Sequence, residues 1–557
     1  MLKKATILLA ILIPIGVPST LAQAVAKDAE TIPVLAFLTP KVRVPLMRAH
    51  TDVPAAPGQA QHHTLKPSHN ILNWIKANVS AQTGMPFSFQ VPAGLEDKVY
   101  AEMGEADSVP GILERVIVAE GLDIYDGAVA QILLTLSGKA DDLQMATKPV
   151  EVYWDGRLHD LANIRAGYPV NNFIYDPQDP AAVSSDLDDR GKRGFIFRIV
   201  NANGKYNTQD PLDGKKLFEG FPSWPTVHWE DWKPVAGENA WVTMAALQVY
   251  HRKYFDPTTG FYRSGKDTIE LQLAEELARA ALLLQAENGG IRMAPLGTFR
   301  EPADLAKSGV RQGSWWYRQI SSENNISWYA ALRMLYQVTG KTVYRDAMVR
   351  IEEYFKSVWN EQERCFYQGT HYSDGAWHPN NDDFALDVQT WAIAAFGPEK
   401  IDGWFGEGAS YRIFQTAVNR SGFYAPSGEL LGVGYTDEND RVSVEWTAGA
   451  IMAAQEIAHD YQDAHPALAR NVLEQAHTMR AHMEQLRTDI SPTQSAYAYS
   501  SKRGWIPFGW YSHAPEVLSL ASTGWIAFVD EQFNPFHLPS AAPAAGEGIP
   551  SNVASRR

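Results

Sequence analysis

Six segments of this chain share one pattern, in which a polar start is followed by a run that is apolar on nearly every side. A helix that is apolar all round lies in the interior of a protein, because no face of it suits water. The six segments are LDIYDGAVAQILLTLSG (122–138), GENAWVTMAALQVYHRKY (237–254), SSENNISWYAALRMLYQVTG (321–340), NDDFALDVQTWAIAAFG (381–397), VSVEWTAGAIMAAQEIAHDY (442–461) and YSHAPEVLSLASTGWIAFV (511–529). We therefore expect a core built from six buried helices.

Amphipathic segments, each with one charged face, follow most of the buried ones. The clear examples are residues 269–285, 342–359, 403–419 and 467–487, while 69–80 could pair with the sixth buried segment and 139–146 is the weaker candidate for the first. This alternation predicts an all-α fold with two concentric rings, an (α/α)6 toroid over residues 69–536. In such a ring the starts of the inner helices converge on one face.

One internal segment and the two chain ends depart from this pattern. Residues from about 150 to 235 contain PVEVYWDG and GFIFRIV among many Asp, Gly and Pro, so we expect a partly stranded insertion there. Residues 1–24 have a positive start, a short apolar stretch and a small-residue cleavage site, which is typical of a signal peptide and predicts a periplasmic or secreted protein. Residues 25–68 are interpreted as a loose lead segment and 537–557 as a disordered tail.

Composition narrows the classes of partner. The formal net charge is −15 and no long basic stripe is present, which argues against nucleic acid. Cys365 is the only cysteine, so neither an intramolecular disulfide nor a thiolate zinc cluster is possible, and we interpret it as a packed thiol. No cofactor, metal or membrane span of the mature chain is expected. Aromatic residues make up 11% of the chain, and their faces suit the C–H groups of sugar rings.

The six polar starts carry a family resemblance. The motifs YDGA, GENAW, ENNIS, LDVQTW, VEWTAG and STGWIAF, in this order and spacing, resemble the six-hairpin glycosidase superfamily over roughly residues 70–535. The resemblance implies an (α/α)6 barrel that binds a glycan chain at the mouth of its inner ring. It also implies hydrolysis by two carboxylates, one that protonates the leaving oxygen and one that activates water.

Carboxylates at the helix starts are the candidates for that chemistry: Asp126, Glu238, Glu323, Asp387 and Glu445. Any one of them could simply stabilise the positive end of its helix. As a set they predict a shared site, because five of six inner helices carry one. Glu445 stands between two apolar residues, which raise a carboxyl pKa, so we predict it as the general acid, with Asp387 or Glu323 as the base. The separation of residues on different helices favours an inverting mechanism.

Polar and aromatic neighbours of these carboxylates are the candidates for substrate binding, together with Asp126 and Glu238. Amides can both donate to and accept from hydroxyl groups, and indole rings can stack on sugars. These candidates are Asn239, Asn324, Asn325, Trp315, Trp316, Trp446, Trp510 and His513.

Three other functions stay open. A polysaccharide lyase would need a Tyr or His base and a cation, and Lys502, Arg503, Tyr511 and His513 lie close together in the sequence. A sugar epimerase of similar fold would use pairs of histidines. A non-catalytic glycan-binding or polymer-assembly protein could keep the barrel without the chemistry. The sugar, its linkage and the oligomeric state are left open.

Overall fold

The computed structural model describes most of the chain after residue 68. The described residues are 69–103, 109–154, 165–167, 193–204, 209–212, 214, 229–231, 233–263, 267–295, 298, 315–380, 383–437, 440–508 and 510–539. All of them belong to the second of the two units into which the chain divides, Met47–Arg557. The predicted signal peptide, the lead segment and most of the predicted tail lie outside the described residues.

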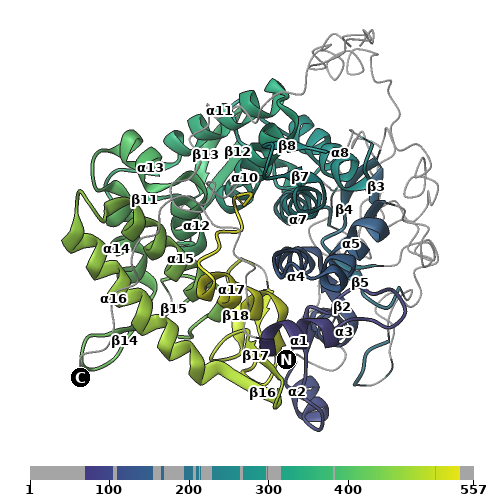
Figure 1. The fold of residues 1–557 in the computed structure, drawn as a ribbon. Coiled ribbons are helices and arrows are strands. Elements are labelled where there is room, and N and C mark those ends of the chain that lie inside the picture. Colours follow the sequence, from purple (N-terminus) through teal and green to yellow (C-terminus); the bar gives the residue numbers. More distant parts are fainter. Residues whose placement is uncertain are drawn as a thin grey trace, which may run out of the picture. The chain divides into compact units, whose positions relative to one another are not determined.

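Six helices form a closed inner ring (Figure 1). They are α4 (Ile124–Leu136), α7 (Ala236–Tyr254), α10 (Ser322–Thr339), α12 (Leu386–Phe396), α15 (Val444–Tyr461) and α17 (Leu520–Asp530). Each packs against the next in this order, and α17 packs against α4, which closes the ring. Nearly all residues of these helices are buried, as their all-round apolar sequences predict.

A second layer of helices surrounds the ring. Each outer helix packs mainly on one inner helix: α5 (Ala140–Trp154) on α4, α8 (Ile269–Leu283) on α7, α11 (Thr342–Ser357) on α10, α13 (Pro398–Phe405) and α14 (Ala409–Ser421) on α12, α16 (Pro466–Met483) on α15, and α1 (His69–Ala77) on α17. The predicted all-α (α/α)6 toroid is thereby confirmed. Two further helices, α2 (Glu96–Glu102) and α3 (Val109–Glu120), precede α4 in the chain.

Two outer helices differ in their bounds from the sequence-based expectation. The segment 403–419, expected as one helix, is divided between α13 and α14, because Gly406 and Gly408 adopt φ values of 89° and 78° that end a right-handed helix. The first outer helix is longer than residues 139–146 and continues through Pro149 to Trp154.

The sixth inner helix begins nine residues later than the segment from Tyr511 suggested. The proline at position 515 interrupts the segment, and two short strands precede the helix. Its cap is Ser519, whose side chain accepts a hydrogen bond from the backbone N–H of Ser522. His513 therefore does not lie at a helix start.

Short antiparallel strands line the approaches to the inner helices. One three-stranded sheet joins β2 (Gly121–Asp123), β5 (Ile199–Asn201) and β6 (Trp229–Asp231), and another joins β9 (Gln319–Ser321), β12 (Gly369–Ser373) and β13 (Ala376–Asn380). A four-stranded sheet has the order β1 (Phe89–Gln90), β20 (Leu518–Ser519), β17 (Gln494–Ala498), β16 (Arg487–Ser491). Strand β2 leads directly into α4, β9 into α10 and β20 into α17, so these strands position the helix starts.

The remaining strands form two-stranded pairs. They are β3 (Arg165–Gly167) with β4 (Arg193–Ile196), β7 (Phe255–Asp256) with β8 (Phe261–Tyr262), β10 (Trp359–Asn360) with β11 (Cys365–Phe366), β14 (Gly422–Tyr424) with β15 (Leu430–Val433), and β18 (Gly504–Ile506) with β19 (Trp510–Ser512). Strands β3 to β6 fall within the segment expected as a partly stranded insertion.

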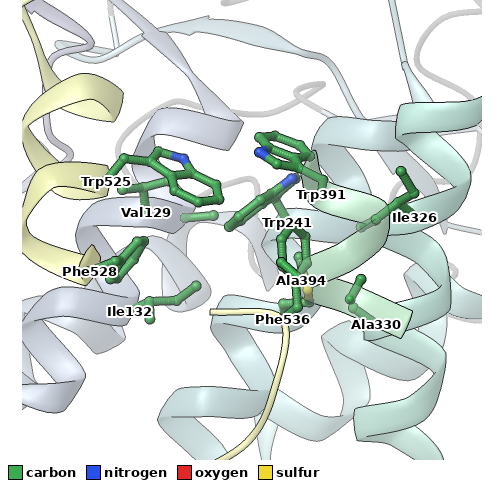
Figure 2. Close-up of a cluster of buried hydrophobic side chains, with 14 of the residues drawn as sticks. Val129, Ile132, Trp241, Ile326, Ala330, Trp391, Ala394, Trp525, Phe528 and Phe536 are labelled. Atoms are coloured by element: carbon green, nitrogen blue, oxygen red, sulfur yellow. The ribbon is translucent and has the colours of Figure 1, made fainter. Parts of the chain in front are cut away.

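Large aromatic side chains fill the centre of the ring (Figure 2). Trp391 of α12 and Trp525 of α17 are stacked, with ring centroids 5.3 Å apart and an interplanar angle of 13°. Trp241 of α7 meets both edge-on, and Phe536, from the segment after α17, contacts all three. The ring is thus a packed core and not a pore. Within the described residues, no helix has the length and apolar character needed to cross a membrane.

Candidate active site

A repeated hydrogen-bond pattern fixes the start of five inner helices. The residue four positions after the N-cap binds the backbone of a segment beside the helix through its own side chain. The pairs are Asn239 with Ile196, Asn325 with Ile291, Gln389 with Phe366, Thr447 with Val433, and Thr523 with Tyr497. Each pair attaches a helix start to a neighbouring backbone segment, and these five segments are called the wall of the ring.

Two of these residues were predicted to bind substrate. The side-chain oxygen of Asn239 accepts from the N–H of Ile196, and its amide group donates to the carbonyls of Ile196 and Val235. Asn325 binds the backbone of Ile291 and Ser321 in the same manner. Both side chains are fully buried. In this structure their amide hydrogens are bound to backbone carbonyls, so both side chains hold the helix start to its surroundings, and a contact with substrate stays a prediction.

The carboxylates occupy a different position in the repeat. Glu323, Asp387 and Glu445 each stand two residues after the N-cap of their helix. Each carboxylate precedes the backbone-binding residue of its helix by two positions, which is about 200° around the helix axis. The two side chains therefore point to nearly opposite sides of the helix. The equivalent residue of α4 is Tyr125. The carboxylates of α10, α12 and α15 therefore occupy equivalent positions at the starts of their helices.

The carboxylates are not needed as helix caps on α10 and α15. Ser321 caps α10 by accepting from the N–H of Asn324, and Ser443 caps α15 by accepting from the N–H of Trp446. Asp387 differs, because one of its carboxyl oxygens accepts from the N–H of Val388 at 2.8 Å. Glu323 and Glu445 are thus available for a role other than capping.

Burial and mutual repulsion shift the acidity of this cluster. Burial raises the pKa of Glu445 to about 8 and the pKa of Asp387 to about 7. The pKa of Asp126 is raised to about 8, first by burial, with the charge of Glu445 adding to the shift. Burial also raises the pKa of Glu323 well above its usual value, and the charges of Asp387, Glu238 and Glu445 add to it. The candidate carboxylates are therefore close enough to influence one another.

Among the described residues, Glu445 has one side-chain hydrogen-bond partner. The hydroxyl of Tyr125 lies 2.5 Å from its Oε1, and that hydroxyl also receives a hydrogen bond from Trp525 Nε1 at 2.5 Å. The arginine nearest in sequence, Arg441, instead binds Asp440 and the hydroxyl of Ser512. Glu445 is thus a buried carboxyl group that a tyrosine holds, and not half of an ion pair with Arg441.

The insertion supplies a cation to the acidic cluster. Arg198 stands between β4 and β5, and its Nε lies 3.4 Å from Glu238 Oε1. Its guanidinium group is 3.9 Å from the carboxylate of Asp123, the N-cap of α4. Sequence reasoning identified neither Arg198 nor Asp123. The available signal was the lone charge within the apolar run GFIFRIV.

The amide Asn324 differs from its neighbour Asn325. It is buried, yet its Nδ2 has no hydrogen-bond partner among the described residues. Its Oδ1 packs so closely on α7 that a Cβ at Gly237 would lie 2.2 Å away, so only glycine fits there. Asn324 therefore differs from Asn325 in having a buried amide donor with no partner among the described residues.

The predicted aromatic contacts differ in exposure. Trp315 is 40% exposed, and Trp316 is half-buried with the Lys233 ammonium 5.7 Å from its ring. Trp510 is half-buried and donates to the hydroxyl of Tyr499. Trp446 is almost fully buried, stacked on Phe508. Trp315, Trp316 and Trp510 are therefore partly accessible to a ligand.

His513 has a protein partner. Its Nδ1 lies 3.2 Å from Glu114 Oε1, and its ring packs edge-on against Phe89. Arg503, on the other side, binds the same Glu114 at 2.7 Å. His513 thus contacts Glu114, which Arg503 also binds. No cluster of three or more potential metal-ligating side chains occurs in the described part of the chain.

No protein-family model matches this chain, and no curated protein sequence matches it. Solved structures do resemble it. A D-mannose isomerase aligns at 9% identity over 85% of this chain and 99% of its own, with a TM-score of 0.49. A sugar epimerase from a ruminal bacterium aligns at 12% identity over 84% and 97%, with a TM-score of 0.47. A GH76 α-mannanase from Bacteroides thetaiotaomicron aligns at 11% identity over 86% and 97%, with a TM-score of 0.44.

The closed double ring of helices is the architecture that the sequence resemblance implied. The likeness concerns the fold, so any activity has to be argued from the residues at the helix starts.

Proposed function

We propose that the protein is a glycoside hydrolase acting on an oligo- or polysaccharide at the end of the ring where the inner helices begin. The observation that carries the proposal is the set of carboxyl groups that converge there with raised pKa values. A glycosidase needs one carboxyl group that stays protonated near neutral pH and a second that is ionised. Glu445 can be the protonated group, because burial raises its pKa to about 8 and the acid form is therefore populated at pH 7.

In the proposed mechanism Glu445 donates its proton to the leaving glycosidic oxygen. Asp387, with a pKa of about 7, accepts a proton from the attacking water. Its hydrogen bond from the N–H of Val388 favours the ionised form, which a base requires. Glu323 remains the alternative base, although burial and, after it, the charges of three neighbouring carboxylates raise its pKa and favour its protonated form. Asp126 and Glu238 serve as substrate contacts in this proposal.

Substrate binding would use the residues that keep free groups or faces. Trp315, Trp316 and Trp510 are partly exposed and offer ring surface, whereas the unpaired Nδ2 of Asn324 is buried and would donate to a sugar hydroxyl only after its surroundings open. Of the residues proposed from the sequence, His513 and Trp446 have their side chains engaged within the protein. Export to the periplasm or the extracellular space after cleavage near residue 24 remains part of the proposal, and N-terminal mass spectrometry of the native protein tests it.

A panel of polysaccharides tests the function. The purified mature chain is incubated with each polymer, and products are assayed both for new reducing ends and for ultraviolet absorption by an unsaturated sugar. Hydrolysis gives reducing ends without the absorbing double bond. A lyase gives both, and an epimerase changes a sugar without cleaving the chain, so either result would replace the hydrolase assignment. Binding without any turnover would support the non-catalytic alternative.

A further inference from the structure

One tyrosine connects the aromatic core of the ring to the carboxylates at its end. Tyr125 lies in the first turn of α4, and its ring packs edge-on against Trp241, with centroids 4.9 Å apart. Its hydroxyl oxygen is 2.5 Å from Trp525 Nε1 and 2.5 Å from Glu445 Oε1. Trp525 is in turn stacked on Trp391, and both belong to the packed cluster at the ring centre (Figure 2). The hydroxyl thus has one neighbour from the core and one from the carboxylates.

The chemistry of these groups determines the direction of both hydrogen bonds. An indole N–H can only donate, so the Tyr125 oxygen must accept from Trp525. A phenol has a single hydrogen, and with the Trp525 side occupied by an incoming donor, that hydrogen is directed at Glu445. The Glu445 Oε1 atom is therefore an acceptor.

We propose that Tyr125 is a positioning residue for Glu445. Oriented by Trp525, it holds Oε1 and leaves Oε2 as the oxygen that carries the acidic proton and presents it to the substrate. This inference rests on the proposed hydrolase function for the step of proton delivery. The hydrogen-bond arrangement itself can be tested without any substrate.

The hydrogen bond also opposes the effect of burial on Glu445. Burial raises the pKa of Glu445, the bond from Tyr125 lowers it by stabilising the ionised form, and the charges of Asp387 and Asp123 raise it. Removing the hydroxyl of Tyr125 should therefore raise the pKa further. The titratable groups that interact electrostatically with Glu445 come from several elements: Tyr125, Asp123 and Asp126 at the start of α4, Glu323 of α10, Asp387 of α12, and the tyrosines Tyr435 and Tyr499.

The test compares Tyr125→Phe with a matched control, Tyr435→Phe. Tyr435 is also buried and interacts electrostatically with Glu445, but the hydrogen bonds that shift its own pKa are to Ser443 and Tyr499 and not to Glu445. Infrared spectra of the full mature chain would follow the protonated carboxyl band as a function of pH. Subtracting the spectrum of Glu445→Gln identifies the band of Glu445. We expect Tyr125→Phe to raise the Glu445 midpoint by about one pH unit, and Tyr435→Phe to leave it within a few tenths of a unit.

Trp525→Phe provides a second, independent variant, because it keeps an aromatic ring but removes the indole donor. The Tyr125 hydroxyl can then turn, so the midpoint should move in the same direction by a smaller amount. On a cleaved glycan, the alkaline limb of the pH–rate profile should move upward in the same order among the variants. An unchanged Glu445 midpoint in both Tyr125→Phe and Trp525→Phe would overturn the inference. A shifted midpoint in a protein that hydrolyses no glycan would support the hydrogen-bond arrangement and refute the hydrolase function.

Discussion

Phe536 lies against Trp241 with ring centroids 5.3 Å apart, although about 300 residues separate them in the chain. Phe536 is fully buried and also contacts Trp391 and Trp525, so the segment after the last helix enters the centre of the inner ring (Figure 2). The nearby Arg333 of α10 donates to the carbonyl of Phe536 and fixes the segment there. The end of the described chain is thus part of the core.

We expect Phe536→Ala to lower the free energy of unfolding by about 3–5 kcal/mol, because a large buried ring is replaced by a cavity. Denaturant unfolding followed by tryptophan fluorescence measures the change. Val349→Ala, at a half-exposed position on α11, is the control and should have little effect. A change below about 1 kcal/mol for Phe536→Ala would show that the segment does not pack in the ring in solution.

The adjacent amides of α10 give a second prediction, which separates structure from function. Asn325→Ala removes three hydrogen bonds and leaves the buried backbone of Ile291 unpaired, so it should destabilise the protein by about 2–4 kcal/mol. Asn324→Ala removes an amide whose Nδ2 has no partner among the described residues, and it should leave stability within about 1 kcal/mol. Asn324→Ala should instead raise KM for the glycan. Equal thermal stabilities for the two variants would contradict this division.

This pair also shows where the sequence ceased to be informative. Asn324 and Asn325 are neighbours of the same type, and only the path of the segment carrying Ile291 decides which of them serves the wall. Arg198 has the same limitation, because its partner Glu238 lies forty positions further along the chain and belongs to another element. Pairings of this kind depend on tertiary structure, which a local pattern does not contain.

Other features could be anticipated because their cause is local. The six all-round apolar segments can be buried only as inner helices, and the structure places them there. The acidic residues of α10 and α15 could be recognised as more than caps, because Ser321 and Ser443 stand two positions earlier and do the capping. Tyr125 was not recognised as the equivalent on α4, since a phenol in an apolar run resembles an ordinary core residue.

Stability should depend on pH through the same carboxyl groups. The pKa of Glu445 is about 8 in the folded protein, well above the value of about 4.3 for an exposed glutamate. Between about pH 4.3 and 8 this group is protonated in the folded protein but ionised in the unfolded chain. Its contribution to stability is therefore greatest below about pH 4 and falls as the pH rises toward 8. Glu445→Gln should therefore be more stable than the natural protein at pH 8, by on the order of 1–4 kcal/mol.

The check is the difference in unfolding free energy between Glu445→Gln and the natural protein, measured at several pH values. This difference should shrink toward zero near pH 4, where the glutamate is protonated in both states. Glu429→Gln, at an exposed position, is the control and should show no such trend. A stability difference independent of pH would mean that Glu445 is not protonated by its surroundings.

The same substitution tests the catalytic role. Glu445→Gln keeps the shape of the side chain but cannot deliver a proton, so we expect hydrolysis to fall by about 10²–10⁴-fold with the fold and glycan binding retained. Rates are measured on the polymer identified by the panel, and binding by calorimetry. Asp387→Asn should fall by a similar factor if Asp387 is the base. Residual turnover within tenfold of the natural protein would remove Glu445 from the role of general acid.

The last prediction concerns stereochemistry. Glu445 and Asp387 extend from α15 and α12, which pack side by side, and neighbouring helix axes are about 8–10 Å apart. Carboxyl groups that extend from the starts of two such helices suit the separation of about 6.5–9.5 Å that leaves room for a water molecule. A retaining enzyme needs a separation of about 5–5.5 Å, so that the second carboxylate can attack the sugar directly. We therefore expect hydrolysis with inversion. Proton NMR of the first product, recorded before mutarotation, reads the anomeric configuration. A product with retained configuration would mean that one carboxylate acts as a nucleophile, even if the same two residues carry the reaction.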